Sequence, residues 1–440
     1  MLVVCDRHIL VFSDKSIGFP EGDPELAWER WKKRSIVGSA DQLNGAYKYL
    51  QLPDAHIYAD RAQKERLRCD LVPVGDRDIH LIAVANGAAD ACSKLLNEPI
   101  GTLMLSNDVH DTSPFVVGDV GHGGPFVHVF TDLSLLMVLE EFDTVTDLVN
   151  YLRNRASFFR GSMNLSIRGE EELIPLYFRG YSDQSKDYDI ARAVAVAGDR
   201  PNHLWIDGGF YEEMTRRPEY IARRERNKIS YLWDSLIERF AGHQLRGTAT
   251  QIRPPGFERH EGVIRFMALE PRLTRRSHSE QFLHAIHGFR NDRDILARTI
   301  LPDEGQGDLA YLFLQMRPPT DRPYDEYRRV RGYLLQLYAM ALLHDRPSLS
   351  RVIGIATEPP LLFKDKRMSE ELVLADRSML TPKQLARAKE EKTEMGLGTV
   401  TASGTWKGQE FPLPKLKFRF EDVAILLSSR SFAGFWLFGF

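Results

Sequence analysis

The chain has 440 residues, with 58 basic and 61 acidic side chains and a formal net charge of −3. This length is enough for two or three domain cores, and the balanced charge excludes a global attraction to nucleic acid or to an anionic membrane. Three cysteines are too few for a disulfide framework or a zinc cluster, so we expect a cytoplasmic protein. We expect neither a signal peptide nor a membrane span, because the apolar residues 422–440 are interrupted by serines and an arginine.

The N-terminal segment predicts a strand followed by a long amphipathic helix. Apolar and β-branched residues dominate 8–16, a length typical of a strand, and apolar positions recur near helical spacing over 25–50. Because side chains alternate between the faces of a strand, Ser13 and Lys15 share one face and Asp14 points to the other. A lysine just beyond the buried part of a strand either takes part in phosphoryl chemistry or extends from the sheet into solvent.

The rest of the first half predicts an α/β layer. Residues 66–72 and 79–85 are predicted strands, and the second is apolar enough to be central in a sheet. A Gly-rich, strand-containing stretch follows at 102–130, and a helix is predicted over 133–159. We therefore expect an α/β fold for this half of the chain.

The second half predicts a helical region followed by a further α/β segment. In chain order we expect a helical block at 211–243, a strand at 309–315, a helix at 324–344, a strand at 351–356 and a surface helix at 384–394. A polar, irregular stretch at 182–201 predicts the domain boundary. We assign residues 1–185 to one domain and residues 186–440 to a second domain of unknown role.

The motif Phe12-Ser13-Asp14-Lys15-Ser16 precedes a helix that carries further matching positions. These are Trp28, Arg30, Trp31, Ser39, Ala40, Gln42, Leu43, Gly45 and Ala46, and the segment Leu139–Asp147 matches as well. On these residues the chain resembles the PD-(D/E)XK, or restriction-endonuclease-like, nuclease superfamily. More closely, it resembles an uncharacterised bacterial group that shares the Phe-Ser-Asp-Lys-Ser motif. The resemblance to the nuclease core covers about the first hundred residues, and the looser resemblance to the group covers most of the chain.

The resemblance implies a restriction-endonuclease-like N-terminal half that acts as a metal-dependent nuclease on DNA or RNA, in host defence or repair. Mg²⁺, or Mn²⁺, would activate water and neutralise the phosphate, and a lysine would stabilise the developing charge. The implied roles are metal binding by Asp14 and Asp6, catalysis by Lys15, Asp14 and Gln42, and phosphate contacts by Arg30, Lys32 and Lys33. Nucleic acid is thus the expected partner, and a homo-oligomer is compatible with the sequence.

A second hypothesis is a catalytically inactive nucleic-acid-binding or protein-interaction module of the same fold. Two departures from the family pattern favour it. Ser13 occupies the position two residues before Lys15, where the family has an acid, and the chain begins inside the expected hairpin, so that Asp6 is the acid left near it. A third hypothesis, a small-molecule hydrolase built around His122 or Asp119, lacks a nucleophile motif.

Three further patterns suggest functional hypotheses with less specific signals. His284 and His287 share a helical face, as metal ligands would, and His278 lies nearby, but no acid or cysteine follows at a fixed spacing. The Gly-rich loop 118–124 has no P-loop lysine behind it. The arginine-rich stretch 216–228 either follows a phosphate backbone or forms a salt-bridged surface helix with its interleaved glutamates.

Overall fold

The structure is a computed structural model of the chain that contains two compact units, Met1–Ile221 and Ala222–Phe440. It describes residues 1–60, 62–66, 71–96, 102–108, 113–121, 123–161, 164–195, 203–246, 260–289, 294–302, 307–318, 323–359, 370–397 and 408–411. Both units combine helices with mixed sheets, so the predicted α/β class is confirmed. The first unit continues past the boundary predicted between residues 185 and 186.

The first unit contains a four-stranded sheet in which three strands run parallel. In sheet order the strands are β1 (Leu2–Cys5), β2 (His8–Ser16), β3 (Asp78–Asn86) and β6 (Val127–Phe130). β1 pairs antiparallel with β2, whereas β2, β3 and β6 run in the same direction. Their carboxyl ends therefore meet at one edge of the sheet and their amino ends at the opposite edge. The central strand predicted at 79–85 is confirmed as β3.

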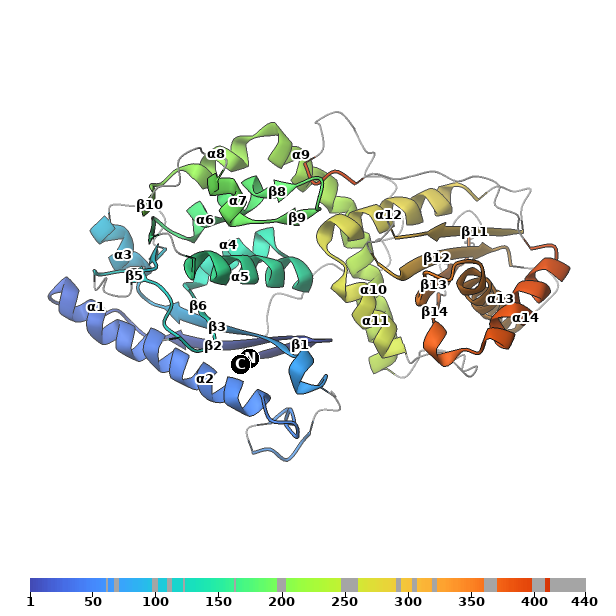
Figure 1. Cartoon of the computed structure of the whole chain (residues 1–440), viewed down its shortest axis with the longest axis horizontal. Helices are drawn as coiled ribbons and strands as arrows, with labels where there is room; N and C mark the ends of the chain where they lie inside the picture. Colours follow the sequence, from blue (N-terminus) through green and yellow to red (C-terminus); the bar gives the residue numbers. More distant parts are fainter. Residues whose placement is uncertain are drawn as a thin grey trace. The chain divides into compact units, whose positions relative to one another are not determined.

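Helices cover both faces of this sheet (Figure 1). One face is covered by α1 (Pro24–Lys32), the π-helix η1 (Lys33–Val37) and α2 (Gly38–Leu50), and the other by α4 (Asp132–Glu141) and α5 (Val145–Phe159). The long helix predicted at 25–50 is confirmed, with a π-helical turn in its middle. Its inward side carries two buried tryptophans, Trp28 and Trp31, and the Trp31 indole N–H donates to the carbonyl oxygen of Ile17 directly after β2.

Capping side chains decide where these helices begin. Asp23 accepts hydrogen bonds from backbone N–H groups in the first turn of α1 and so starts that helix. The single helix predicted over 133–159 is wrong, because the structure divides this stretch into α4 and α5. Thr144 accepts a hydrogen bond from the backbone N–H of Asp147 and starts α5 as a new helix.

A second sheet of the first unit has the order β10-β7-β4-β5. Its strands are β4 (Met104–Ser106), β5 (Val116–Val117), β7 (Asn164–Ile167) and β10 (His203–Ile206), and β8 (Tyr181–Ser182) pairs separately with β9 (Asp187–Tyr188). Further described helices are η2 (Val74–Asp76), α3 (Ala89–Leu96), α6 (Glu170–Arg179), α7 (Ile190–Ala195), α8 (Phe210–Arg216) and α9 (Pro218–Asn227). Of the strand predicted at 66–72, residues 67–70 lie outside the described part, and Arg66 forms a single bridge to Tyr58.

Three consecutive buried glutamates begin α6, and each has its own partner. Glu170 pairs with the guanidinium of Arg155 at 3.0 Å, and the Thr102 hydroxyl donates to Glu171 at 2.7 and 2.5 Å. Glu172 accepts from two backbone N–H groups at the start of α8. Burial raises the pKa of Glu171 to about 7, and the hydrogen bond from Thr102 only partly offsets this increase.

Because of that shift, Glu171 is expected to make stability depend on pH. Its pKa in the folded state lies above the ordinary value of 4.5, so the native state keeps a proton that the unfolded chain releases between these two values. The free energy of unfolding therefore falls as pH rises through this window. Glu171→Gln is expected to match the wild type near pH 5 and to be more stable by roughly 2–3 kcal/mol at pH 8.

Urea unfolding of both proteins from about pH 5 to 8 measures this difference. Glu213→Gln is the matched control, because Glu213 is exposed and its neighbour Arg217 lowers its pKa instead. The control should show no gain that grows with pH. A constant difference between Glu171→Gln and wild type at every pH would show that Glu171 is ionised in the folded state throughout.

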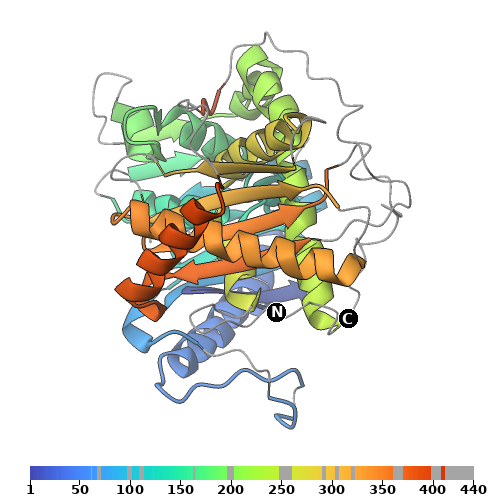
Figure 2. The ribbon, with the colours of Figure 1, turned by 90° about the vertical axis from the view of Figure 1, so that its right-hand side faces the viewer.

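The second unit has one mixed sheet between two helical layers, and Figure 2 shows one of these layers in front of the sheet. In sheet order the strands are β11 (Ile295–Ile300), β12 (Leu309–Met316), β13 (Arg351–Thr357) and β14 (Glu371–Asp376). β12 and β13 are parallel, and each outer strand is antiparallel to its neighbour. The helices are η3 (Lys228–Ser230), α10 (Tyr231–Leu245), α11 (His260–Leu269) and α12 (Arg272–His287) on one side, and α13 (Tyr324–Asp345), η5 (Arg377–Met379) and α14 (Pro382–Glu394) on the other.

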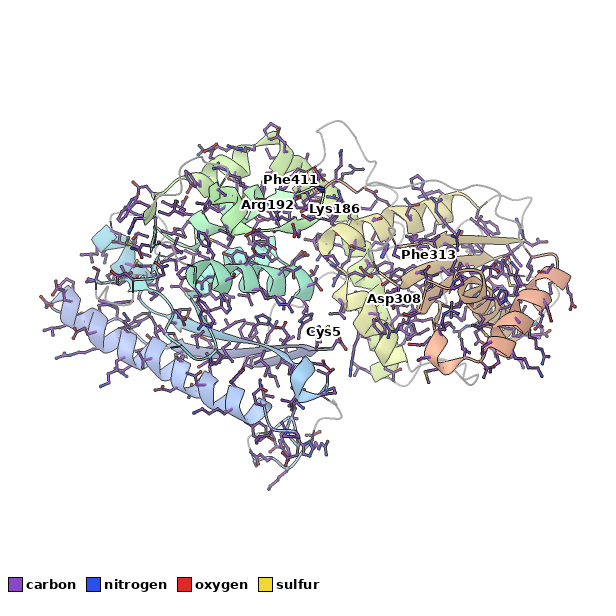
Figure 3. All side chains as sticks on the ribbon, viewed as in Figure 1. Cys5, Lys186, Arg192, Asp308, Phe313 and Phe411 are labelled. Atoms are coloured by element: carbon purple, nitrogen blue, oxygen red, sulfur yellow. The ribbon has the colours of Figure 1, made fainter. Side chains whose placement is uncertain are left out.

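Alternate residues of β12 supply the two cores of this unit. Tyr311 and Phe313 pack with α10, α11 and α12, whereas Leu312 and Leu314 pack with α13 and α14. Figure 3 shows Phe313 within the second unit, and its ring centroid lies 4.9 Å from that of Phe282 on α12. The strands and helices predicted at 309–315, 324–344, 351–356 and 384–394 are confirmed as β12, α13, β13 and α14. These elements were predictable because continuous apolar runs and amphipathic helical patterns are strong local signals.

Two sequence features lie outside the described residues, namely His122 and the apolar segment 422–440. Among the residues that are described, no helix combines the length and the apolar character that crossing a membrane requires.

Candidate functional site

The carboxyl edge of β2, β3 and β6 gathers polar side chains from three neighbouring strands. Asp14 and Lys15 lie near the end of β2, Asn86 ends β3, and Asp132 begins α4 directly after β6. In open α/β sheets, ligands bind beyond the carboxyl ends of parallel strands. This edge is therefore the candidate functional site of the first unit.

On the α2 face of this edge, β2 and α2 bring Lys15 and Gln42 near each other. The Ser13 hydroxyl donates to the Gln42 side-chain oxygen at 3.0 Å. The Lys15 Nζ lies 2.8 Å from the point that a Cβ on Gly38 would occupy. Ser13 and Lys15 are two residues apart on β2, and their neighbours Gln42 and Gly38 are four residues apart on α2. Both separations span about 6 Å, so the two contacts fit a helix that runs antiparallel to β2. The predicted common face of Ser13 and Lys15 is confirmed.

On the opposite face, Asp14 is exposed and linked to the neighbouring strands. The Asn86 side-chain NH₂ donates to Asp14 Oδ1 at 3.0 Å, and the Asn86 oxygen accepts from the backbone N–H of Asp132 at 2.9 Å. One amide thus connects the ends of β2, β3 and α4 and orients the Asp14 carboxylate. The other carboxylate oxygen of Asp14 is available for a cation or a solvent molecule.

The basic residues predicted to contact phosphates lie on α1 and η1, in the helical stretch that leads into α2. Arg30 and Lys33 are exposed, whereas Lys32 lies 5.6 Å from the ring centroid of Trp28. The carbonyl oxygen of Lys33 is 3.6 Å from the same Gly38 position that Lys15 approaches. The backbone of Lys33 and the ammonium of Lys15 therefore both lie beside Gly38, where η1 joins α2.

Asp6 does not belong to this edge, and the predicted pairing of Asp6 with Asp14 as ligands of one ion is wrong. Asp6 lies in the turn between β1 and β2, at the amino end of β2. The six strand steps from His8 to Asp14 alone span roughly 20 Å. The physical reason is the hairpin itself, because its turn must lie at the opposite end of β2 from the strand's carboxyl terminus.

A second polar cluster occupies the amino edge of the same sheet, and it was not predicted from the sequence. Asp78 Oδ2 accepts hydrogen bonds from His8 Nδ1 at 2.7 Å, His80 Nε2 at 2.9 Å and Arg153 Nη2 at 2.7 Å. Burial raises the pKa of Asp78, but the hydrogen bonds from both histidines and the charge of Arg153 outweigh it and hold that pKa well below its ordinary range. His128, on β6, lies beside His80. Burial and the charge of Arg155 keep the pKa of His128 well below the usual value for histidine.

A local signal for this cluster was present in the sequence. Asp78 and His80 are two residues apart on a strand, so their side chains share a face. Their partner His8 is 70 residues from Asp78, and only the parallel register that pairs His8 with Asp78 brings them together. No pattern of spacing within one strand reveals that pairing.

The histidines of α12 do not converge on a metal site within the described structure. His284 and His287 are exposed, whereas His278 is buried beside the rings of Trp233 and Tyr311. Among the described residues, the three ligating side chains that lie close together are those of the amino-edge cluster.

Charged side chains of the arginine-rich stretch 216–228 and of the Gly-rich loop 118–124 form ion pairs within the protein. The salt-bridged surface helix predicted at 216–228 is confirmed only in part: Arg217 pairs with Glu213 and Lys228 with Glu225, whereas Arg223 is buried and pairs with the distant Glu410. Asp119 of the Gly-rich loop accepts a hydrogen bond from Arg160 at 2.7 Å. These contacts give neither segment a ligand site of its own.

No protein-family model matches the chain, and no curated protein or solved structure is significantly similar to it.

Proposed function

We propose that the first unit is a metal-dependent nuclease that cleaves phosphodiester bonds in DNA or RNA at the carboxyl edge of β2, β3 and β6. The observation that supports this proposal most is that an accessible carboxylate, Asp14, and the ammonium of Lys15 lie at the same edge of the sheet, one on each face of the end of β2. A carboxylate that binds a cation and an amine that approaches a phosphate are the two charges that phosphodiester hydrolysis requires.

The residues at this edge fit Mg²⁺, or Mn²⁺, in the manner of sites that share the ion with a substrate. Such sites supply one or two carboxylates and leave the other positions to water and phosphate oxygens. Asp14 offers one exposed carboxylate whose orientation Asn86 holds. When bound, the ion would neutralise phosphate charge and supply an activated water.

The chain's own residues divide the remaining tasks. Lys15 places its ammonium where negative charge develops, and the exposed Arg30 and Lys33 bind flanking phosphates. Gln42 accepts from Ser13 through its side-chain oxygen, which leaves its NH₂ group free to donate to a nucleotide. Ser13, which replaces the family's acid, thus orients Gln42.

Lys15→Ala is expected to reduce cleavage by about 10²–10³-fold, because it removes a cation at the developing charge. The measurement is cleavage of labelled single- and double-stranded DNA and RNA with Mg²⁺, with Mn²⁺ and with a chelator. Lys48→Ala is the matched control, since Lys48 is an exposed lysine near the end of α2, the helix that packs beside Lys15. Its cleavage rate should equal that of the wild type.

Two results would contradict the proposal. Equal cleavage by Lys15→Ala and wild type would remove Lys15 from the site. Metal-independent binding of nucleic acid by a wild-type protein that cuts none of the four substrates would instead support the catalytically inactive binding module.

A further inference from the structure

The amino edge of the first sheet holds a donor set that differs in chemistry from the carboxyl edge. The ligating atoms of His8, Asp78 and His80 all lie within 4.8 Å of one another. Two of these residues come from β3 and one from β2, which are paired over nine residues, so the backbone beneath them is rigid. We propose that these three side chains form a binding site for a transition-metal dication.

The three donors favour zinc or a neighbouring first-row metal. Two imidazole nitrogens and one carboxylate oxygen suit Zn²⁺, Fe²⁺, Co²⁺ or Ni²⁺, whereas Mg²⁺ and Ca²⁺ require oxygen ligands. A set of three protein ligands also leaves coordination positions open for water or a substrate. This site is therefore distinct from the proposed Mg²⁺ site in both ligand type and place.

Each histidine needs only a small movement relative to the Asp78 carboxylate to accept an ion between them. Ligand bonds of 2.0–2.1 Å in a tetrahedral shell place donor atoms about 3.4 Å apart. The two histidine nitrogens lie 2.7 and 2.9 Å from Asp78 Oδ2, so each must move away from it by roughly half an ångström. As the metal takes the place of each N–H proton that points at the carboxylate, a neutral imidazole would carry its proton on the other ring nitrogen, and a doubly protonated imidazole would release one proton.

Access and neighbouring charge also permit an ion here. The two imidazoles are largely buried, but the Asp78 side chain is 20% exposed, so the edge is open to solvent at the carboxylate. Arg153 donates to the same oxygen, and its side chain is 45% exposed. Its guanidinium can therefore turn into solvent or remain as a partner that supports the ligating carboxylate.

The test is metal binding by the full chain after removal of metals with a chelator. Titration with Co²⁺, followed by its visible absorption and by calorimetry, should show one saturable site from which Zn²⁺ displaces Co²⁺ and millimolar Mg²⁺ does not. His8→Ala and His80→Ala should each weaken binding by at least about 100-fold, since loss of a ligand exceeds loss of an outer-shell partner. His287→Ala is the control, because His287 is an exposed histidine on α12, and it should bind like the wild type.

Asp78→Asn keeps the side-chain shape and decides the question if a histidine variant fails to fold, as judged by circular dichroism. Unchanged Co²⁺ affinity in the folded variants, or no saturable binding by the wild type, would overturn the metal site and leave a hydrogen-bonded cluster that joins β2 to β3. Displacement of Co²⁺ by Mg²⁺ would overturn the assignment to a transition metal. This experiment measures metal binding and not cleavage, so its result tests the metal site separately from the proposed nuclease activity.

Discussion

Arg155→Leu is expected to lower the free energy of unfolding of the first unit by about 3–5 kcal/mol, because it leaves the buried Glu170 carboxylate without a positive charge beside it and with the Tyr151 hydroxyl as its donor. Arg155 on α5 is 2% exposed, and its guanidinium contacts both carboxylate oxygens of Glu170 at 3.0–3.1 Å. The same guanidinium lies 5.0 Å from the ring centroids of Phe130 and Phe159. Leucine fills part of the volume but supplies no charge to Glu170.

Chemical denaturation of wild type and variant measures this loss, and hydrogen exchange of peptides from α5 and α6 locates it. The double variant Arg155→Leu with Glu170→Leu should recover most of the stability, since neither charge then remains buried. Arg217→Leu removes an exposed ion pair with Glu213 and should change stability by less than about 1 kcal/mol. A loss as small as that control for Arg155→Leu would mean that Glu170 is protonated or hydrated in the folded state.

The corresponding variant of the second unit, Arg331→Leu, is expected to cost about 3 kcal/mol, at the lower end of the same range. Arg331 on α13 is fully buried and donates to Glu371, and its guanidinium lies 3.5 Å from Glu358. It also donates to the Tyr327 hydroxyl at 3.1 Å. The substitution therefore removes a buried cation from two carboxylates, and leaves Glu371 its 2.9 Å ion pair with Arg328 and Glu358 its hydrogen bond from the Tyr324 hydroxyl.

Arg331→Lys separates charge from shape in this network. Lysine keeps the positive charge but lacks the planar fork that reaches Glu371 and Glu358 together, so we expect an intermediate loss of stability. Urea denaturation of the three proteins, with hydrogen exchange of peptides from α13 and β14, provides the comparison. Equal stability of Arg331→Leu and the wild type would contradict the buried network.

Local patterns predicted the elements that dominate both units. The apolar run of β3 and the apolar, β-branched composition of 8–16 identified two central strands, and the alternation of side chains along a strand placed Ser13 and Lys15 on one face. The division of 133–159 into α4 and α5 escaped this reasoning. There the cap at Thr144 interrupts a stretch whose hydrophobic spacing continues through it.

The candidate sites show where sequence reasoning reached its limit. Lys15, Asp14 and Gln42 came from one motif and the helix behind it, and a strand–helix unit keeps such residues close in space. Asp6 is equally near in sequence, but the hairpin directs it to the far end of β2. The contribution of Asn86, which orients Asp14, depended on a partner 72 residues away.

The sequence by itself determined the α/β class, most central strands and helices, and the face of β2 on which Lys15 lies. These properties follow from the two- and 3.6-residue periods of local hydrophobicity. Only the tertiary structure decided which side chains share an edge. The parallel register of β2 with β3 brings His8 to Asp78, because strand pairing joins residues distant along the chain through backbone hydrogen bonds that leave no local pattern in the sequence.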